Sequence, residues 1–250
     1  MKTFRKSMMS KGMVALLSIG GAINAMANQP VEVNVPVDHV YSPKGFDSND
    51  ESEIIISGHL PNLCYRTPKS SSKIVGNKIE ITVSSFYHNP AMFCAEAIVP
   101  FVEVVKVGVL DKGQYEIVVN KATPYEAKSD IAISESISGA QDDFVYANVD
   151  HIEKNLGDRN IKIKGYNPSD CFVFDKVDVV SNNKDTLSIL PKMKQVSDFC
   201  PLKMVPFEYD FEVPRVENEK TILLHVRSME GRSVNSLFEQ VDLQMNGVHK

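Results

Sequence analysis

The residues best suited to chemistry in this 250-residue chain are its four cysteines, because thiolates bind metals, act as nucleophiles or oxidise to disulfides. The cysteines are Cys64, Cys94, Cys171 and Cys200. No two of them form a C-x-x-C pair, and the histidine nearest to Cys94 is His88. We therefore expect structural cysteines, and we predict neither a metal site nor a cofactor.

Other patterns typical of catalysis or metal binding are weak. Asp-His pairs recur at 38–39 and 150–151, but neighbouring residues on a strand point to opposite faces, so we interpret them as repeated strand starts. The acidic stretch "DSNDE" at 47–51 lacks the glycine and distal glutamate of a calcium loop, which favours a solvated acidic loop. The chain contains no G-x-S-x-G, H-E-x-x-H, P-loop or G-x-G-x-x-G motif. We predict that it is not an enzyme, with an unrecognised enzyme or metal protein as the alternative.

One candidate binding surface surrounds the first two cysteines. Aromatic side chains with an arginine on loops are typical of interaction hot spots. The candidates here are Tyr65, Arg66, Tyr87, His88 and Phe93. The alternative is that half of the aromatic side chains fill the core. The corresponding stretch of the second unit, "PKMKQVSDFC", has fewer aromatic residues and more lysine, so we expect the two ends to bind different partners.

A second candidate surface contains Arg227 and Arg232, within a stretch at 225–238 that we expect to be the last hairpin. Two neighbouring arginines in an acidic chain are able to bind a carboxylate or a sugar acid. Ordinary surface charges, or pairs with neighbouring carboxylates, are the alternative.

The elements that position these residues come from a duplication. "IIISGHLPNLCY" at 54–65 aligns with "IKIKGYNPSDCF" at 161–172 after a shift of 107 residues. "CAEAIVPF" at 94–101 aligns with "CPLKMVPF" at 200–207 after a shift of 106. Matched blocks in the same order, with shifts that differ by one residue, indicate an internal repeat.

The first copy carries an insertion. "VDHV" at 37–40 matches "VDHI" at 149–152 with a shift of 112, which places five extra residues in "SPKGFDSNDE" at 42–51. We expect this polar stretch to be a surface loop. The predicted organisation is a signal peptide, a first repeat and a second repeat, at residues 1–27, 28–141 and 142–250.

Apolar residues alternate with polar ones in both copies, as a half-buried strand requires. "KIEITV" at 78–83 and "FEYDFEV" at 207–213 are examples, and no segment has a helical stripe. Gly76 and Asn77 form a pair typical of a hairpin turn. Short strands separated by turn residues predict an all-β fold of two tandem antiparallel β-sandwich domains, loosely immunoglobulin-like, with about seven strands each.

The duplication also selects the disulfide pairing, because a unit copied whole should carry its own crosslink. Of the three possible pairings we predict Cys64 with Cys94 and Cys171 with Cys200. Closing loops of this size would stabilise each repeat by about 3–4 kcal/mol in the chain-entropy model.

The repeats resemble uncharacterised secreted bacterial proteins built of tandem immunoglobulin-like β-sandwich repeats with one disulfide each. The resemblance rests on the strand block "VLDKGQYEIVVN" at 109–120 and its counterpart "RVENEKTILLHV" at 215–226. It implies a fold and a secreted location but no activity. The chain differs from antibody domains, which pack a tryptophan on the disulfide, because it contains no tryptophan.

The first residues have the pattern of a secretory signal peptide, with basic residues, an apolar run and "AMA" ending at Ala27, where we expect cleavage. Cleavage removes four basic residues, so Lys and Arg fall from 27 to 23 against 32 Asp and Glu, and the net charge becomes −9. An acidic surface repels phosphate backbones, which argues against nucleic acid as a partner. No segment is apolar over the length needed to span a bilayer, so we expect no membrane insertion.

Together these observations predict a non-enzymatic protein of the periplasm or the extracellular medium. We expect it to bind a protein or cell-envelope partner, in adhesion, envelope structure or protein–protein binding. The alternative is a periplasmic inhibitor or chaperone that acts on a client protein through a loop or an exposed strand.

Overall fold

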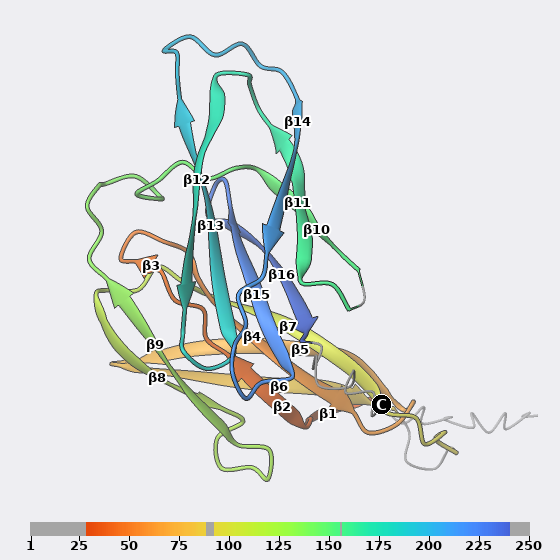
Figure 1. The fold of residues 1–250 in the computed structure, drawn as a ribbon. Helices are drawn as coiled ribbons and strands as arrows, with labels where there is room; N and C mark the ends of the chain where they lie inside the picture. Colours follow the sequence, from red (N-terminus) through yellow and green to blue (C-terminus); the bar gives the residue numbers. More distant parts are fainter. Residues whose placement is uncertain (1–28, 89–92, 156, 241–250) are drawn as a thin grey trace, which may run out of the picture.

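The structure is a computed structural model that describes residues 29–88, 93–155 and 157–240, and in these ranges the chain is all-β (Figure 1). Its strands are, in chain order, β1 (Val31–Asn34), β2 (Val37–Tyr41), β3 (Phe46–Asp47), β4 (Ser52–Leu60), β5 (Tyr65–Val75), β6 (Lys78–Tyr87), β7 (Val99–Gly108), β8 (Gly113–Val119), β9 (Ala127–Ser134), β10 (Val149–Lys154), β11 (Asn160–Asn167), β12 (Phe172–Ser181), β13 (Thr186–Gln195), β14 (Val205–Glu212), β15 (Thr221–Ser228) and β16 (Arg232–Glu239). No helix long and apolar enough to cross a membrane occurs in the described part of the chain. The predicted signal peptide lies outside it.

The strands form four sheets, two from each repeat. In the first repeat the sheet β2-β4-β7 packs against the sheet β1-β6-β8-β9-β3, with β5 on the other edge of β6. In the second repeat β10-β11-β14 packs against β12-β13-β15-β16. Buried residues from both sheets of a repeat form one core, which contains Ile56 and Ile81 in the first and Ile163 and Ile189 in the second. The predicted β-sandwich fold is therefore confirmed.

The two repeats share their strand pairing as well as their cores. The set β2-β4-β7 has the same order as β10-β11-β14, and β5-β6-β8-β9 has the same order as β12-β13-β15-β16. Most neighbours are antiparallel, but β6 pairs with β8, and β13 with β15, in parallel. The sequence did not indicate these parallel pairs. They arise because β7 and β14 lie in the opposite sheet, so the chain returns to its first sheet in the original direction.

The glycine kept in both copies marks a close approach between backbones. Gly58 and Gly165 lie in β4 and β11, each opposite a register shift in the strand paired with it, β2 or β10. A Cβ on Gly58 would overlap the carbonyl oxygen of Pro36, and a Cβ on Gly165 would overlap that of Asn148. Only glycine allows strands to approach this closely without a shift of the backbone.

The insertion at 42–51 is not the solvated surface loop that its composition predicts. Phe46 and Asp50 are buried, and β3 within the insertion pairs with β9. The Phe46 ring lies 5.5 Å from the imidazole of His225 and 5.0 Å from the guanidinium of Arg227, both in the second repeat. The prediction was wrong because the partners that bury this segment lie about 180 residues away in the sequence.

The repeats also meet through apolar and polar contacts outside the insertion. Tyr41 and Ile55 of the first repeat form a buried cluster with Leu223 of the second, where the second repeat stands on the first (Figure 1). His39 Nε2 lies 2.7 Å from Asp185 Oδ2 across the same boundary. The two sandwiches therefore meet in an interface that contains buried side chains of both repeats.

The glycine contacts predict the cost of adding one methyl group. We expect Gly58→Ala and Gly165→Ala each to lower the free energy of unfolding by about 2 kcal/mol or more, because backbone atoms must move to admit the Cβ. Urea denaturation is the measurement. Gly113→Ala is the matched control, since its Cβ would meet only the Tyr115 ring at 3.8 Å, an ordinary contact. Equal stability of all three variants would contradict the close approach.

Candidate functional site

Both predicted disulfides are confirmed. Cys64 is bonded to Cys94 and Cys171 to Cys200, with Cα–Cα distances of 5.5 and 5.6 Å. Each joins the turn after β4 or β11 to the connection that leads into β7 or β14. We call the end of each sandwich closed by its disulfide the first tip and the second tip. Two disulfides indicate an oxidising extracellular or periplasmic environment.

The two tips are built on the same hydrogen bonds. The backbone N–H of Cys64 donates to Asn62 Oδ1 at 3.0 Å, and that of Cys171 donates to Ser169 Oγ at 3.2 Å. The carbonyl of each of these cysteines accepts a hydrogen bond at 2.9 Å, from the N–H of His88 in the first tip and of Val196 in the second. The duplication therefore preserves the backbone of the tip, although the polar side chain differs.

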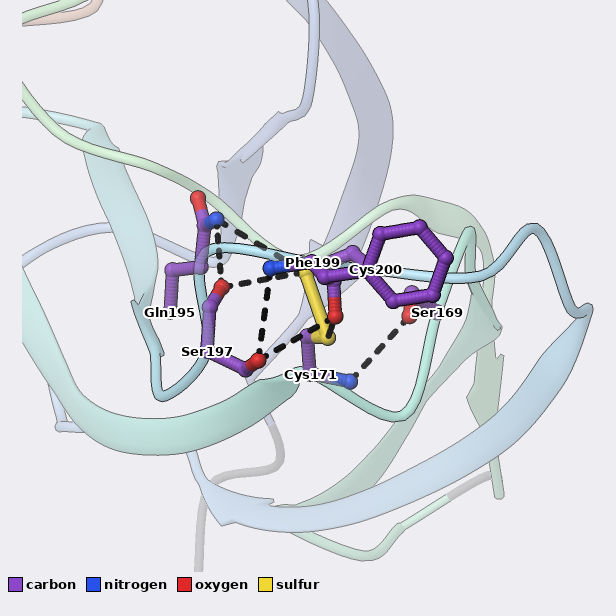
Figure 2. Close-up of a disulfide and its surroundings, with 6 residues drawn as sticks. All are labelled: Ser169, Cys171, Gln195, Ser197, Phe199 and Cys200. Carbon is purple, nitrogen blue, oxygen red and sulfur yellow. Dashed lines mark hydrogen bonds between the residues drawn. A yellow bond between two sulfur atoms is a disulfide. The ribbon is translucent and has the colours of Figure 1, made fainter.

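Further hydrogen bonds hold the connection that follows β13 at the second tip (Figure 2). Gln195 Nε2 donates to the carbonyl of Ser197 at 2.8 Å. The Ser197 hydroxyl donates to the carbonyl of Phe199 at 3.1 Å and accepts from the N–H of Phe199 at 3.3 Å. Beyond Cys200, the N–H of Lys203 donates to the carbonyl of Pro168 at 3.0 Å. The loop is thus fixed on both sides of the disulfide.

These fixed loops display large apolar side chains to solvent. The exposed fraction is 81% for Phe199, 93% for Leu202 and 74% for Met204 in the second tip, and 94% for Phe93 in the first. The second tip lies at the end of its sandwich that points away from the first repeat (Figure 1). Clustered exposure of large apolar side chains on a folded protein marks an interaction surface.

The residues proposed from the sequence for the first tip do lie at one end of the first sandwich. Tyr65 and Tyr87 are opposite each other on β5 and β6, with ring centroids 4.9 Å apart, and Tyr65 packs partly on the core. Arg66 is exposed beside them. His88 is exposed and bonded through its backbone to Cys64, whose disulfide partner follows Phe93. The first tip therefore contains exposed residues, such as Arg66 and His88, as well as an aromatic ring, that of Tyr65, that packs on the core.

Leu202 and Met204 of the second tip were not identified from the sequence. The pattern typical of a hot spot is aromatic residues with an arginine, and the newly found residues of this tip are not aromatic. The signal was present in "DFCPLKM", where apolar residues stand on both sides of Cys200 without the alternation of a strand.

Arg227 and Arg232 do not form the predicted binding pair. They do lie on the predicted last hairpin, in β15 and β16. However, Arg227 is only 2% exposed, and its Nη atoms donate to Asp50, Asp142 and the carbonyl of Gly45. Arg232 is exposed, and its Nη2 donates to Asn148 Oδ1 at 2.6 Å. Arg227 therefore pairs with carboxylates of the chain itself, which was the alternative to the binding of an external carboxylate or sugar acid.

The Arg227 side chain is the centre of a buried charge cluster between the repeats. Its two Nη atoms lie 3.0 and 2.9 Å from the two carboxylate oxygens of Asp50, and Nη2 also donates to Asp142. Burial raises the pKa of Asp142 to about 6; Arg227 opposes this rise, and the neighbouring Asp50 adds to it. One guanidinium therefore holds two carboxyl groups, one from the insertion and one from the connection between repeats.

A second buried pair stands beside the first. His225 Nδ1 lies 3.3 Å from Glu53 Oε1 and 2.9 Å from Asn235 Oδ1. Burial alone would raise the pKa of Glu53, but hydrogen bonds from His225, Ser233 and Asn235 and the charge of the imidazole outweigh it and lower this pKa to about 2. Glu53 is therefore ionised at neutral pH, and its Oε1 accepts hydrogen bonds from Ser233 and Asn235.

The repeated Asp-His pairs make different contacts in the two copies. His39 binds Asp185 across the repeat boundary, whereas His151 lies on the surface, 3.2 Å from the neighbouring Asp150. Because the geometry is not repeated, the pairs do not form two equivalent sites, and their interpretation as repeated strand starts agrees with their place in β2 and β10.

Comparison with known proteins supports the fold. Residues 54–128 match the family model of the ORF11 beta-sandwich domain. This segment runs from β4 to the start of β9 and so includes most of the first sandwich. No curated protein and no solved structure matches the chain significantly. The resemblance to tandem β-sandwich repeats with one disulfide each therefore holds for the fold and the disulfides.

The charge cluster predicts a large stability difference between the two arginines. We expect Arg227→Met to lower the free energy of unfolding by about 3–5 kcal/mol, because two buried carboxyl groups lose their counter-charge. Arg232→Met, at an exposed position, is the control and should change it by less than about 0.5 kcal/mol. Urea denaturation at pH 7 measures both. Similar values for the two variants would contradict the buried cluster.

The lowered pKa of Glu53 predicts a pH dependence. A depressed carboxyl pKa stabilises the fold above its unfolded value of 4.5, and this stabilisation is lost as the pH falls towards 2. The unfolding free energy of the wild type minus that of Glu53→Gln should therefore fall by about 3 kcal/mol between pH 5 and pH 2. Denaturant titrations across this range give the difference. A difference that does not vary with pH would show that Glu53 is not held as a carboxylate.

Proposed function

We propose that this chain is an exported, non-enzymatic binding protein that engages a protein or cell-envelope partner through its disulfide-closed tips. The observation that carries the proposal is the display of Phe93, Phe199, Leu202 and Met204 on loops fixed by disulfides and hydrogen bonds.

The physical argument is one of preorganisation. A flexible loop loses conformational entropy when it binds, and a loop already fixed in place loses less. The second tip is held by its disulfide, by Ser197 and by the bond from Lys203 to Pro168. Its apolar side chains are therefore already held in exposed positions before a partner binds. Their burial against an apolar surface of the partner would contribute favourable binding free energy in proportion to the apolar area removed from water.

Export is supported by the oxidised cysteines and by the signal-peptide pattern at 1–27. We infer that the mature protein acts in the periplasm or outside the cell, in adhesion, envelope structure or protein–protein binding. A nucleic-acid partner is disfavoured by the acidic net charge. The second candidate function is that of an inhibitor or chaperone. A loop that is closed by a disulfide and exposes Leu202 is suited to insertion into a single client protein.

Site-specific photo-crosslinking in intact cells tests the proposal. A photoreactive amino acid at position 199 or 202 should give the same crosslinked partner, since both side chains project from the second tip. The control is position 137, because Ile137 is also 81% exposed but lies in the connection between the repeats. A single stoichiometric protein would favour an inhibitor or chaperone. Crosslinking that does not exceed the control at either tip position would refute binding through the second tip.

A further inference from the structure

The second tip displays apolar side chains that project from the molecule. Val196, Phe199, Leu202 and Met204 are 56%, 81%, 93% and 74% exposed. Neither tyrosine nor arginine occurs in this stretch of sequence, which is "VSDFCPLKM". Side chains that are exposed to this extent stand out from the loop and do not line a groove, so the second tip is a convex apolar surface.

The two tips differ in the partner that their side chains suit. The first tip combines Tyr65, Tyr87 and Arg66. Tyrosine, tryptophan and arginine dominate the hot spots of protein–protein interfaces, whereas leucine and valine are under-represented there. Leucine, phenylalanine and valine are the residues whose transfer into a bilayer is most favourable. The composition of the first tip therefore suits a protein partner, and that of the second suits a lipid surface.

The charges around the second tip cancel. The residues at 168–171 and 194–204 include equal numbers of positive and negative side chains, which are Lys194, Lys203, Asp170 and Asp198. Lys203 Nζ lies 3.2 Å from Asp170 Oδ2. Because the whole chain has a net charge of −5, the second tip is a neutral region of an acidic molecule. Anionic headgroups repel an acidic surface, and this repulsion is absent at the tip.

The lysines are placed to remain in water when the apolar side chains do not. Lys194 and Lys203 are both exposed, and Lys203 stands between Leu202 and Met204 in the chain. A lysine stem is long enough to lie along apolar surface while its ammonium stays at the polar boundary. The two ammonium groups are therefore able to reach lipid phosphates from beside inserted apolar side chains.

The backbone that carries Leu202 is anchored on both sides. Cys200 is held by the disulfide to Cys171, and the N–H of Lys203 donates to the carbonyl of Pro168 at 3.0 Å. The exposure of Leu202 is therefore a property of a fixed backbone. A fixed loop loses less conformational entropy than a flexible one when its side chains enter another phase.

We propose that the second tip enters the surface of a phospholipid leaflet, with Phe199, Leu202 and Met204 among the upper acyl chains. The inference rests on the proposed function, because it names the partner of the same tip. Burial of the three apolar side chains drives the contact. The sequence predicted no membrane insertion because it contains no segment long enough to span a bilayer, but a loop that enters only one leaflet needs none.

The contact would also orient the molecule. The second tip lies at the end of its sandwich that points away from the first repeat (Figure 1). A leaflet at this tip leaves the first repeat on the side away from the lipid. The two repeats would then have different partners, a lipid surface for the second and a protein for the first.

Tryptophan fluorescence of the full mature protein tests the contact. The chain contains no tryptophan, so Leu202→Trp supplies a single reporter. On addition of phosphatidylcholine vesicles its emission should shift to shorter wavelength, and phospholipids brominated on the upper acyl chain should quench it. The matched control is Ile137→Trp, because Ile137 is 81% exposed but lies in the connection between the repeats. Its emission should not change.

Flotation with the same vesicles measures the contribution of the apolar side chains. Leu202→Asp with Met204→Asp should lower the partition coefficient of the protein by about tenfold or more, because a carboxylate is unfavourable among acyl chains. Ile137→Asp should leave it unchanged. Since the tip has no net charge, added salt should change the partition of the wild type by less than about twofold.

The outcomes separate this inference from the proposed function. Emission of Leu202→Trp that stays constant at all lipid concentrations would overturn the lipid contact. Equal changes at positions 202 and 137 would also overturn it, because they would indicate non-specific adsorption. If vesicles have no effect but position 202 crosslinks to a protein in cells, the tip binds a protein and the proposed function stands. Failure of both experiments would refute both.

Discussion

The structure depends on one buried interaction, the contact of Arg227 with Asp50 and Asp142. Asp50 comes from the insertion in the first repeat, Asp142 from the connection, and Arg227 from β15 of the second repeat. An arginine removed from water needs its counter-charges in place, so the three segments must come together for the protein to fold. Tandem domains that are joined only by a linker move relative to each other. Here the charge cluster and the apolar cluster around Ile55 join the two sandwiches through buried contacts.

Duplication followed by divergence explains which features are shared. The glycines at the close approach, the cysteines and the parallel pairs β6–β8 and β13–β15 are the same in both repeats, since each sandwich needs them to fold. The copies differ where they meet each other and where they face solvent. The first repeat carries the insertion, which is buried where the repeats meet, and the second carries an aliphatic tip. The tips, whose exposed side chains differ between the copies, are the features to which the proposed function assigns binding.

The sequence predicted what is local or repeated. Alternation placed Ile79 and Ile81 in the core, and the match between copies selected the disulfide pairs. The sequence did not predict the buried charge cluster, because nothing in "DSNDE" indicates that Asp50 pairs with Arg227 and because an acidic loop is usually solvated. The parallel pairs were missed for a similar reason: alternation gives the faces of a strand and not its neighbour. Leu202 was missed because the hot-spot pattern weighs aromatic residues with an arginine, although apolar residues stand on both sides of Cys200 without the alternation of a strand.

The central claim is that the two repeats form a single cooperative unit, and differential scanning calorimetry of the oxidised protein at pH 7 tests it most directly. The buried cluster predicts one transition, with a calorimetric enthalpy equal to the van't Hoff enthalpy, because neither sandwich is able to leave the interface without exposing unpaired charge. Two transitions, or a calorimetric enthalpy about twice the van't Hoff value, would mean that the sandwiches unfold independently and would contradict the claim.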